Sequence, residues 1–274
     1  MLPWNYGFEW NTGHVVFLGA FYTVLVIVAT TVVNAIWRSR RALRQHTLDE
    51  LRWSSDFHEL SAADRACRHV ITGELRSREC PNAFDCRKCE THARLTANQA
   101  PPFAADEEEI FGMAFPLDRF YHRGHTWVRR EPDGTVTIGL DELGRRLIGA
   151  PDALQLPAPG THLSVNGAAF RLKKRDADVR VLSPLDGEVI ETGTGEWLLR
   201  LRPDRLDEQA FRHLLCGSEV RPWLMRELER LQLALTAEAA MASLADGGVP
   251  VTDIAAGYPE MNWDAVCGEM FLEP

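Results

Sequence analysis

The sequence predicts a mainly β barrel or sandwich domain with C-terminal helices, preceded by one N-terminal transmembrane helix. Three observations predict it. Residues 14–37 form one uncharged apolar run. Residues 117–204 contain short segments of alternating apolar and polar residues between Gly, Pro and Asp turns. Residues 205–247 carry leucines at three- and four-residue intervals, as one face of a helix does.

The apolar run is long enough to cross a membrane. Residues 14–37 contain no Asp, Glu, Lys or Arg, and about 20 helical residues span the hydrocarbon core. A cleaved signal peptide is disfavoured because residues 1–13 carry no Lys or Arg and the run exceeds the usual apolar core of such peptides. A buried soluble helix is disfavoured because few core helices are apolar on every face. We therefore expect a transmembrane helix at 14–37.

The charges on either side of this run predict its orientation. Only Glu9 precedes it, whereas four arginines follow it closely. Positively charged residues stay on the cytoplasmic side of a membrane. We therefore expect a single-pass protein of the bacterial inner (cytoplasmic) membrane, with residues 1–13 outside and the soluble part in the cytoplasm. The four arginines are Arg38, Arg40, Arg41 and Arg44.

A cysteine-rich segment, residues 38–100, is expected to follow the helix. Four of the six cysteines lie in it with the spacing C-x12-C-x5-C-x2-C, and the last pair is a CxxC. Two thiolates at CxxC spacing can turn toward one metal ion, and four fill a tetrahedral site. His69 and His92 are spare nitrogen ligands. The predicted metal ligands are Cys67, Cys80, Cys86 and Cys89.

Three interpretations of this cluster stay open. Persistent disulfides are disfavoured in the cytoplasm, so the thiols are metal ligands, redox groups or small packed side chains. A structural zinc site is favoured, because the segment is polar and has few large apolar residues to form a core of its own. An iron–sulfur cluster is the alternative, although the spacing matches neither common ferredoxin pattern. Cys216 and Cys267 stand apart and are expected to be ordinary buried thiols.

The remaining elements follow in order. Residues 101–116, with a Pro-Pro pair and the acidic run that ends at Glu109, are expected to be a linker. A β-hairpin is expected over 125–140 around Pro132-Asp133-Gly134. A short helix ending at Gly149 and further short strands follow it. The C-terminal region, 205–274, is expected to be helical.

Several ordered motifs in the β-rich part resemble one known family. They are His125-Thr-Trp127-Val128, Ile138-Gly139-Leu140, Leu182-Ser-Pro-Leu-Asp-Gly-Glu-Val189 and Gly195-Glu-Trp-Leu198. Together they resemble the H-protein of the glycine cleavage system, a lipoyl-domain-like fold, over roughly residues 117 to 235. The resemblance implies the fold. The membrane helix and the cysteine-rich segment lie outside the usual extent of that family.

The resemblance also implies a lysine at a hairpin tip that carries a lipoyl arm, and this lysine is missing. Counting back from Pro184 reaches Asp176, and counting forward from Gly167 reaches Ala177. Amide attachment needs a primary amine, so we expect a degenerate domain without lipoate. Lys173 or Lys174 could carry the arm only if the hairpin pairing shifted by two or three residues.

No catalytic motif is present, so we expect a protein that is not an enzyme. GxSxG, HExxH and phosphate-loop patterns are absent from the sequence. Nucleic acid is not expected as a partner, because the formal net charge is −9. His125 is expected to be structural, and Asp178 and Asp186 to be turn or loop residues.

Three functional hypotheses remain. The first is a non-catalytic subunit that docks or assembles other subunits of a larger membrane complex, of redox or respiratory type. The second is an iron–sulfur electron-transfer subunit that uses the four-cysteine cluster. The third is a lipoyl-type carrier modified at Lys173 or Lys174.

Overall fold

The chain divides into two units in the computed structural model, Met1–Leu48 and Asp49–Pro274. The structure describes residues 11–44, 47–97, 109–238 and 252–273. The four arginines between residues 38 and 44 lie in a helix, but their side chains are outside the described part of the structure. Residues 101–108 of the expected linker are also outside it.

The first unit consists of one long helix, α1 (Thr12–Arg44). Its stretch Thr12–Trp37, 26 residues, is long and apolar enough to cross a membrane. At a rise of about 1.5 Å per residue this stretch is about 39 Å long, more than the roughly 30 Å of a hydrocarbon core. Every described side chain from 11 to 37 is exposed or half-exposed. The prediction of a long apolar N-terminal helix is confirmed.

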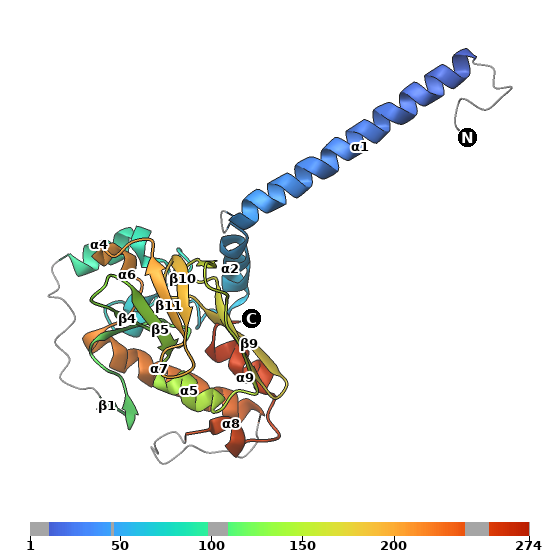
Figure 1. The fold of residues 1–274 in the computed structure, drawn as a ribbon. Coiled ribbons are helices and arrows are strands. Elements are labelled where there is room, and N and C mark those ends of the chain that lie inside the picture. Colours follow the sequence, from blue (N-terminus) through green and yellow to red (C-terminus); the bar gives the residue numbers. More distant parts are fainter. Residues whose placement is uncertain (1–10, 45–46, 98–108, 239–251, 274) are drawn as a thin grey trace. The chain divides into compact units, whose positions relative to one another are not determined.

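Two antiparallel sheets of the second unit line one apolar core (Figure 1). The larger sheet has the strand order β3-β4-β5-β11-β10-β7, and the smaller has the order β6-β8-β9. The mainly β fold with C-terminal helices is therefore confirmed. The strands of the larger sheet are β3 (Arg119–Tyr121), β4 (Thr126–Arg130), β5 (Val136–Leu140), β7 (His162–Leu163), β10 (Gly187–Thr192) and β11 (Leu199–Pro203). Those of the smaller sheet are β6 (Ala153–Gln155), β8 (Ala168–Lys174) and β9 (Ala177–Leu182).

The predicted hairpin is formed by β4 and β5, with Arg130 opposite Val136 across the turn. Helix α5 (Glu142–Ile148) follows it and is capped by Asp141, whose carboxylate accepts the Gly144 N–H at 2.7 Å. The glycine of the Ile138-Gly139-Leu140 motif is explained by close packing. A Cβ there would lie 2.4 Å from the Glu196 carbonyl oxygen and 2.7 Å from the ring of Trp127, so no larger residue fits.

The described part of the expected linker contains a small hairpin. Strands β1 (Glu109–Ile110) and β2 (Met113–Ala114) pair antiparallel. Ile110, Met113 and Phe115 are buried in the main core. These large apolar residues make 109–115 a packed element, because their burial offsets the cost of ordering the chain.

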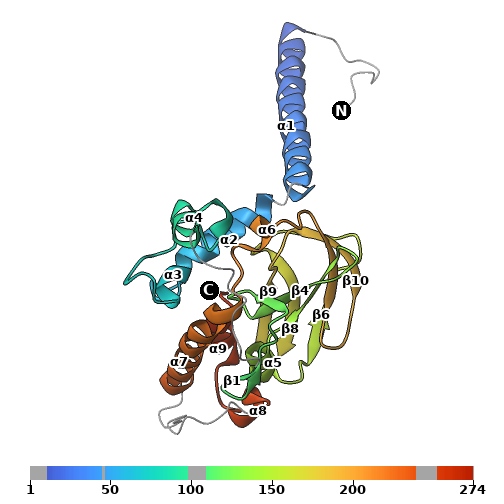
Figure 2. The ribbon, with the colours of Figure 1, turned by 90° about the vertical axis from the view of Figure 1, so that its left-hand side faces the viewer.

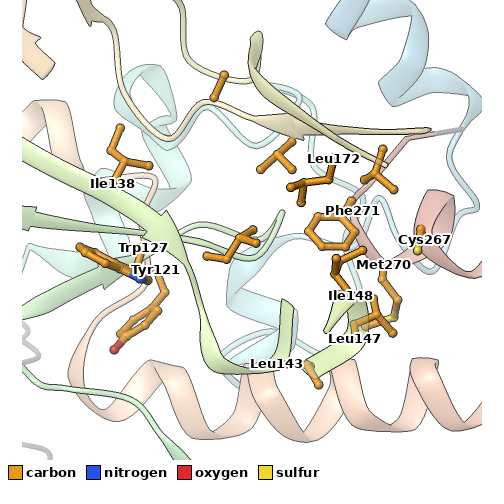
Figure 3. Close-up of a cluster of buried hydrophobic side chains, with 14 of the residues drawn as sticks. Tyr121, Trp127, Ile138, Leu143, Leu147, Ile148, Leu172, Cys267, Met270 and Phe271 are labelled. Carbon is orange, nitrogen blue, oxygen red and sulfur yellow. The ribbon is translucent and has the colours of Figure 1, made fainter. Parts of the chain in front are cut away.

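Helices make up the C-terminal region, but in separate pieces. A continuous leucine stripe predicts one helix, whereas the chain turns at Gly217, which has φ of +55°. Helices α7 and α9 pack against each other (Figure 2). Figure 3 shows Met270 and Phe271 beside Leu172 and Ile148 of the β domain. The pieces are α6 (Glu208–Phe211), η2 (Gly217–Glu219), α7 (Val220–Glu238), α8 (Ile254–Gly257) and α9 (Trp263–Met270).

The cysteine-rich segment shares a core with the β domain. Trp53 and Phe57 of α2 pack with Phe84, and this cluster includes Leu182 of β9 and Leu272 of the C-terminal end. The sequence suggested that the segment has only its own few apolar residues to form a core. The structure differs, because Leu182 of β9 and Leu272 of the C-terminal end complete the cluster. Its elements are α2 (Thr47–Glu59), α3 (Arg68–Ile71), η1 (Cys86–Lys88) and α4 (Glu90–Thr96).

Candidate functional site

The hairpin of β8 and β9 holds the position where the resemblance implies the arm-bearing lysine. Lys174 pairs with Ala177, so Arg175 and Asp176 form the two-residue turn. Asp176 is exposed at the tip, whereas Ala177 is fully buried in β9. Of the two positions reached by counting, Asp176 is therefore the one at the tip, and its side chain is a carboxylate.

The turn is tied down by two other parts of the chain. Arg175 has φ of +56°, a left-handed conformation that is unusual for a residue with a side chain. Its N–H donates a hydrogen bond of 2.6 Å to the Asp152 carboxylate, and its guanidinium donates to the Tyr258 carbonyl at 3.4 Å. These bonds hold the turn in one conformation.

Lys174 is engaged inside the protein. Its Nζ donates to the Ala150 carbonyl at 2.8 Å and lies 3.3 Å from the Asp253 carboxylate. Asp253 also accepts the Ala256 N–H at 2.9 Å, which caps α8. Gly149 makes room for it, because a Cβ there would lie 2.2 Å from the Asp253 carboxyl carbon. The amine is therefore buried under the C-terminal segment.

Lys173 differs from its neighbour. It is exposed, and it lies on β8 opposite Asp178, one pair further from the turn. Asp178 is therefore a strand residue and not the turn residue that the sequence suggested. Its carboxylate accepts a hydrogen bond of 3.1 Å from Arg171. Lys173 is the exposed amine of this hairpin, and it lies off the tip.

The four clustered cysteines fall into two pairs, each fixed by backbone hydrogen bonds. In the first pair, the Cys67 N–H donates to the Arg78 carbonyl and the Cys80 N–H to the Arg65 carbonyl, both at 2.8 Å. In the second pair, Cys86 and Cys89 flank η1, with the Cys89 N–H 3.2 Å from the Cys86 carbonyl oxygen.

The two pairs are close enough to affect each other's ionisation. Burial raises the pKa of Cys86 to about 12; Arg68 opposes this, and Cys80, Cys67 and Cys89 raise it further. All six cysteines of the chain are free thiols. Within the described ranges, no three Cys, His, Asp or Glu side chains already converge on one metal position.

The two histidines of this segment pair with each other. His69 Nε2 lies 3.0 Å from His92 Nδ1, and His69 Nδ1 bonds to Glu74. Burial, with the charges of Arg68 and His69, lowers the pKa of His92 to about 4. Both nitrogens of His69 are therefore occupied, which leaves the thiols as the main donor set.

Asp186 connects the cysteine-rich segment to the β domain. Its carboxylate accepts the Val165 N–H at 2.7 Å and the Arg87 guanidinium at 2.5 Å. Arg87, next to Cys86, also bonds to Asp85 at 2.8 Å. The sequence identifies Asp186 as a loop residue, and only the fold brings it to the thiol segment.

The structure contains a buried ionic network that the sequence did not predict. His125 Nδ1 lies 2.9 Å from the Asp141 carboxylate, and Glu227 lies 2.6 Å from Arg230. Arg230 also contacts Asp64 at 2.9 Å. Burial alone lowers the pKa of His125, but Asp141 and Glu227 raise it more, so the net shift is upward. The contacts fit the structural role expected for His125. The five residues come from distant elements, which is why no local pattern predicts them.

Acid is expected to destabilise the fold between about pH 6.5 and pH 4. Burial lowers the pKa of His122 to about 3 and that of His213 to about 4, whereas an unfolded histidine titrates near pH 6.5. Below about pH 6.5 the unfolded chain binds protons that the folded chain does not, so stability is lost. Thermal unfolding of the full chain across this range measures the loss.

A His213→Asn variant is the control for this prediction. Its melting temperature should depend less steeply on pH, because one buried neutral imidazole is gone. His125 acts in the opposite direction: its raised pKa adds stability below about pH 6.5 that is lost as the pH rises through its folded value. A melting temperature that stays level from about pH 7 to pH 5 would contradict the prediction.

The family model and the most similar relatives point to one family. The family model "Glycine cleavage H-protein" matches residues 119–213. The glycine cleavage system H protein of Alkalilimnicola ehrlichii is 31% identical over 103 residues, covering 32% of this chain and 79% of the relative. The same protein of Psychrobacter sp. is 29% identical over 119 residues, covering 38% and 93%.

The chain also has a likeness to a solved structure. The crystal structure of a glycine cleavage system H protein from Mycobacterium marinum is 22% identical, with a TM-score of 0.34. The match covers 40% of this chain and 97% of that one. The family match at 119–213 includes the β8–β9 hairpin, and it excludes the apolar helix and the four clustered cysteines.

Proposed function

Because this chain belongs to the glycine cleavage H-protein family but has an aspartate at the hairpin tip, we propose that it is a non-catalytic, membrane-anchored subunit. In this proposal the H-protein-like domain docks or assembles other subunits of a larger membrane complex. It shuttles no group. Asp176 carries the proposal, because a carboxylate cannot form the amide that tethers a lipoyl arm.

The contacts of the hairpin support a fixed role. Lys174, the nearest amine to the tip, is buried and bonded to Ala150 and Asp253. Arg175 is bonded to Asp152 and Tyr258. A swinging arm needs a free, solvent-exposed attachment point, whereas this turn is held on both sides. Such a hairpin suits a rigid docking element.

The apolar helix supports attachment to a membrane. Its exposed apolar residues over Thr12–Trp37 need lipid or another apolar helix to cover them. We propose a single pass through the bacterial inner membrane, with the N-terminus outside and the H-protein-like domain in the cytoplasm, from the arginines that follow the helix. The proposed partners are the membrane and other protein subunits, of a redox or respiratory assembly.

Isolation of the native full-length protein in mild detergent tests this function. We expect it to migrate with other subunits, and its intact mass to lack a lipoyl increment in a host that lipoylates other proteins. A lone monomer would contradict the docking role. A lipoyl increment mapped to Lys173 or Lys174 would instead establish the carrier alternative.

Two variants sharpen the mass measurement. Lys173→Arg removes the exposed amine, and Lys174→Arg removes the buried one. Under the proposal neither substitution changes the modification state, because neither lysine is modified. A lipoyl increment in the parent chain that disappears in one of these variants would identify the modified residue and overturn the proposal.

A further inference from the structure

The cysteine-rich segment brings four thiols together from 23 residues of chain, and neither the family match nor the docking role accounts for them. Ala66 and Glu79 form an isolated antiparallel bridge. In such a pair, residues diagonal to each other on one face have Cα atoms about 7–8 Å apart. The bridge sets Cys67 and Cys80 in this diagonal relation, so both thiols face the same side.

The second pair has the CxxC spacing of a metal knuckle. Cys86 and Cys89 enclose the single turn η1, whose start is fixed by the Asp85 carboxylate accepting the Arg87 N–H at 3.0 Å. At this spacing, two thiolates can turn toward one metal ion. The Phe84 N–H donates to Cys80 Sγ at 3.3 Å, which fixes the position of this sulfur and would stabilise a thiolate there once a metal is bound.

Anchoring contacts hold the two pairs within one body. Arg68, next to Cys67, bonds to Glu219 and donates to the Arg212 carbonyl at 2.6 Å. Arg123 of the β domain donates to the Ala66 carbonyl at 3.0 Å. Arg87, next to Cys86, bonds to Asp186. The backbone around both pairs is thus attached to the same β domain.

We propose that Cys67, Cys80, Cys86 and Cys89 bind one structural zinc ion as a closed four-thiolate site. The bridge and the turn position the two halves of the site. Because no three donor side chains of the described residues lie around one metal position, binding requires the four thiol side chains to rotate toward the ion. Each thiol that binds releases its proton to solvent. The zinc stays divalent, so no electron transfer is needed. The site rests on residues 65–89 and does not depend on the docking proposal.

Zinc fits these residues better than an iron–sulfur cluster does. A single tetrahedral ion needs only the short reach between a bridge and an adjacent turn, with metal–sulfur distances of about 2.3 Å. A cluster needs cysteines spread around inorganic sulfide. The buried surroundings, with three of the four cysteines less than a tenth exposed, also suit a closed structural site.

Metal analysis of the full chain, purified in detergent, tests the site. We expect about one zinc per chain. The Cys86→Ser variant should lose most of it, whereas Cys216→Ser and Cys267→Ser, which alter buried thiols outside the segment, should keep it. Iron with labile sulfide in place of zinc, or retention of zinc in the Cys86→Ser variant, would overturn the proposal.

Cobalt substitution gives a second measurement that does not depend on a folded variant. After zinc is removed by a chelator, Co²⁺ added to the unaltered chain should produce the intense visible and near-ultraviolet absorption of tetrahedral cobalt–thiolate coordination. The Cys216→Ser chain should give the same spectrum. The spectrum of octahedral cobalt with oxygen ligands would overturn the proposal.

Discussion

Replacing Arg230 with methionine is expected to lower the free energy of unfolding by about 3–5 kcal/mol. The guanidinium lies 2.6 Å from the Glu227 carboxylate, 2.9 Å from Asp64 and 2.7 Å from the Glu269 carbonyl oxygen. Its removal leaves two buried carboxylates, those of Glu227 and Asp64, without this cation. Chemical denaturation of the full chain in detergent, followed by tryptophan fluorescence, measures the change.

Arg226→Met is the matched control for this prediction. Arg226 lies one turn earlier on the same helix, and its guanidinium bonds at the surface to the Ala63 carbonyl at 3.1 Å. The same substitution there should cost less than about 1 kcal/mol, because solvent supplies new partners to the exposed groups. Equal effects of the two substitutions would contradict the prediction, because the buried ion pairs of Arg230 would then contribute no more to stability than the surface hydrogen bond of Arg226.

Replacing Trp263 with alanine is expected to cost about 3–5 kcal/mol. The indole is fully buried, and its Nε1 donates to the Tyr258 carbonyl at 3.0 Å. The cavity loosens the C-terminal segment, 252–273, which covers Lys174 through Asp253. We therefore also expect Lys174 to react faster with an amine-specific reagent. Mass spectrometry of the labelled peptides gives the rate, with the exposed Lys173 as the internal reference.

Met225→Ala is the control for the Trp263→Ala substitution. Met225 is 48% exposed on α7, so its loss should change stability by no more than about 0.5 kcal/mol. It should also leave the labelling ratio of the two lysines unchanged. A Trp263→Ala chain with parental stability and parental labelling would contradict the view that this segment holds the hairpin.

Local patterns in the sequence were sufficient for the main elements. The apolar run predicts α1 because an uncharged apolar stretch of this length favours one continuous helix that is long enough to cross a membrane. The hairpin around Pro132-Asp133-Gly134 follows from alternation and turn chemistry. The ordered motifs predict the H-protein fold, and the sequence itself shows that neither counted position, Asp176 or Ala177, is a lysine. These inferences need only neighbouring residues.

Only the tertiary structure decided how the β8–β9 hairpin and the cysteine-rich segment pack against the rest of the second unit. Counting from two motifs left Asp176 and Ala177 as alternatives, and strand pairing placed Asp176 at the tip. The burial of Lys174 depends on Asp253, 79 residues later in the chain. Contacts of this kind depend on the packing of distant elements, and sequence spacing carries no information about which distant side chain fills a given position.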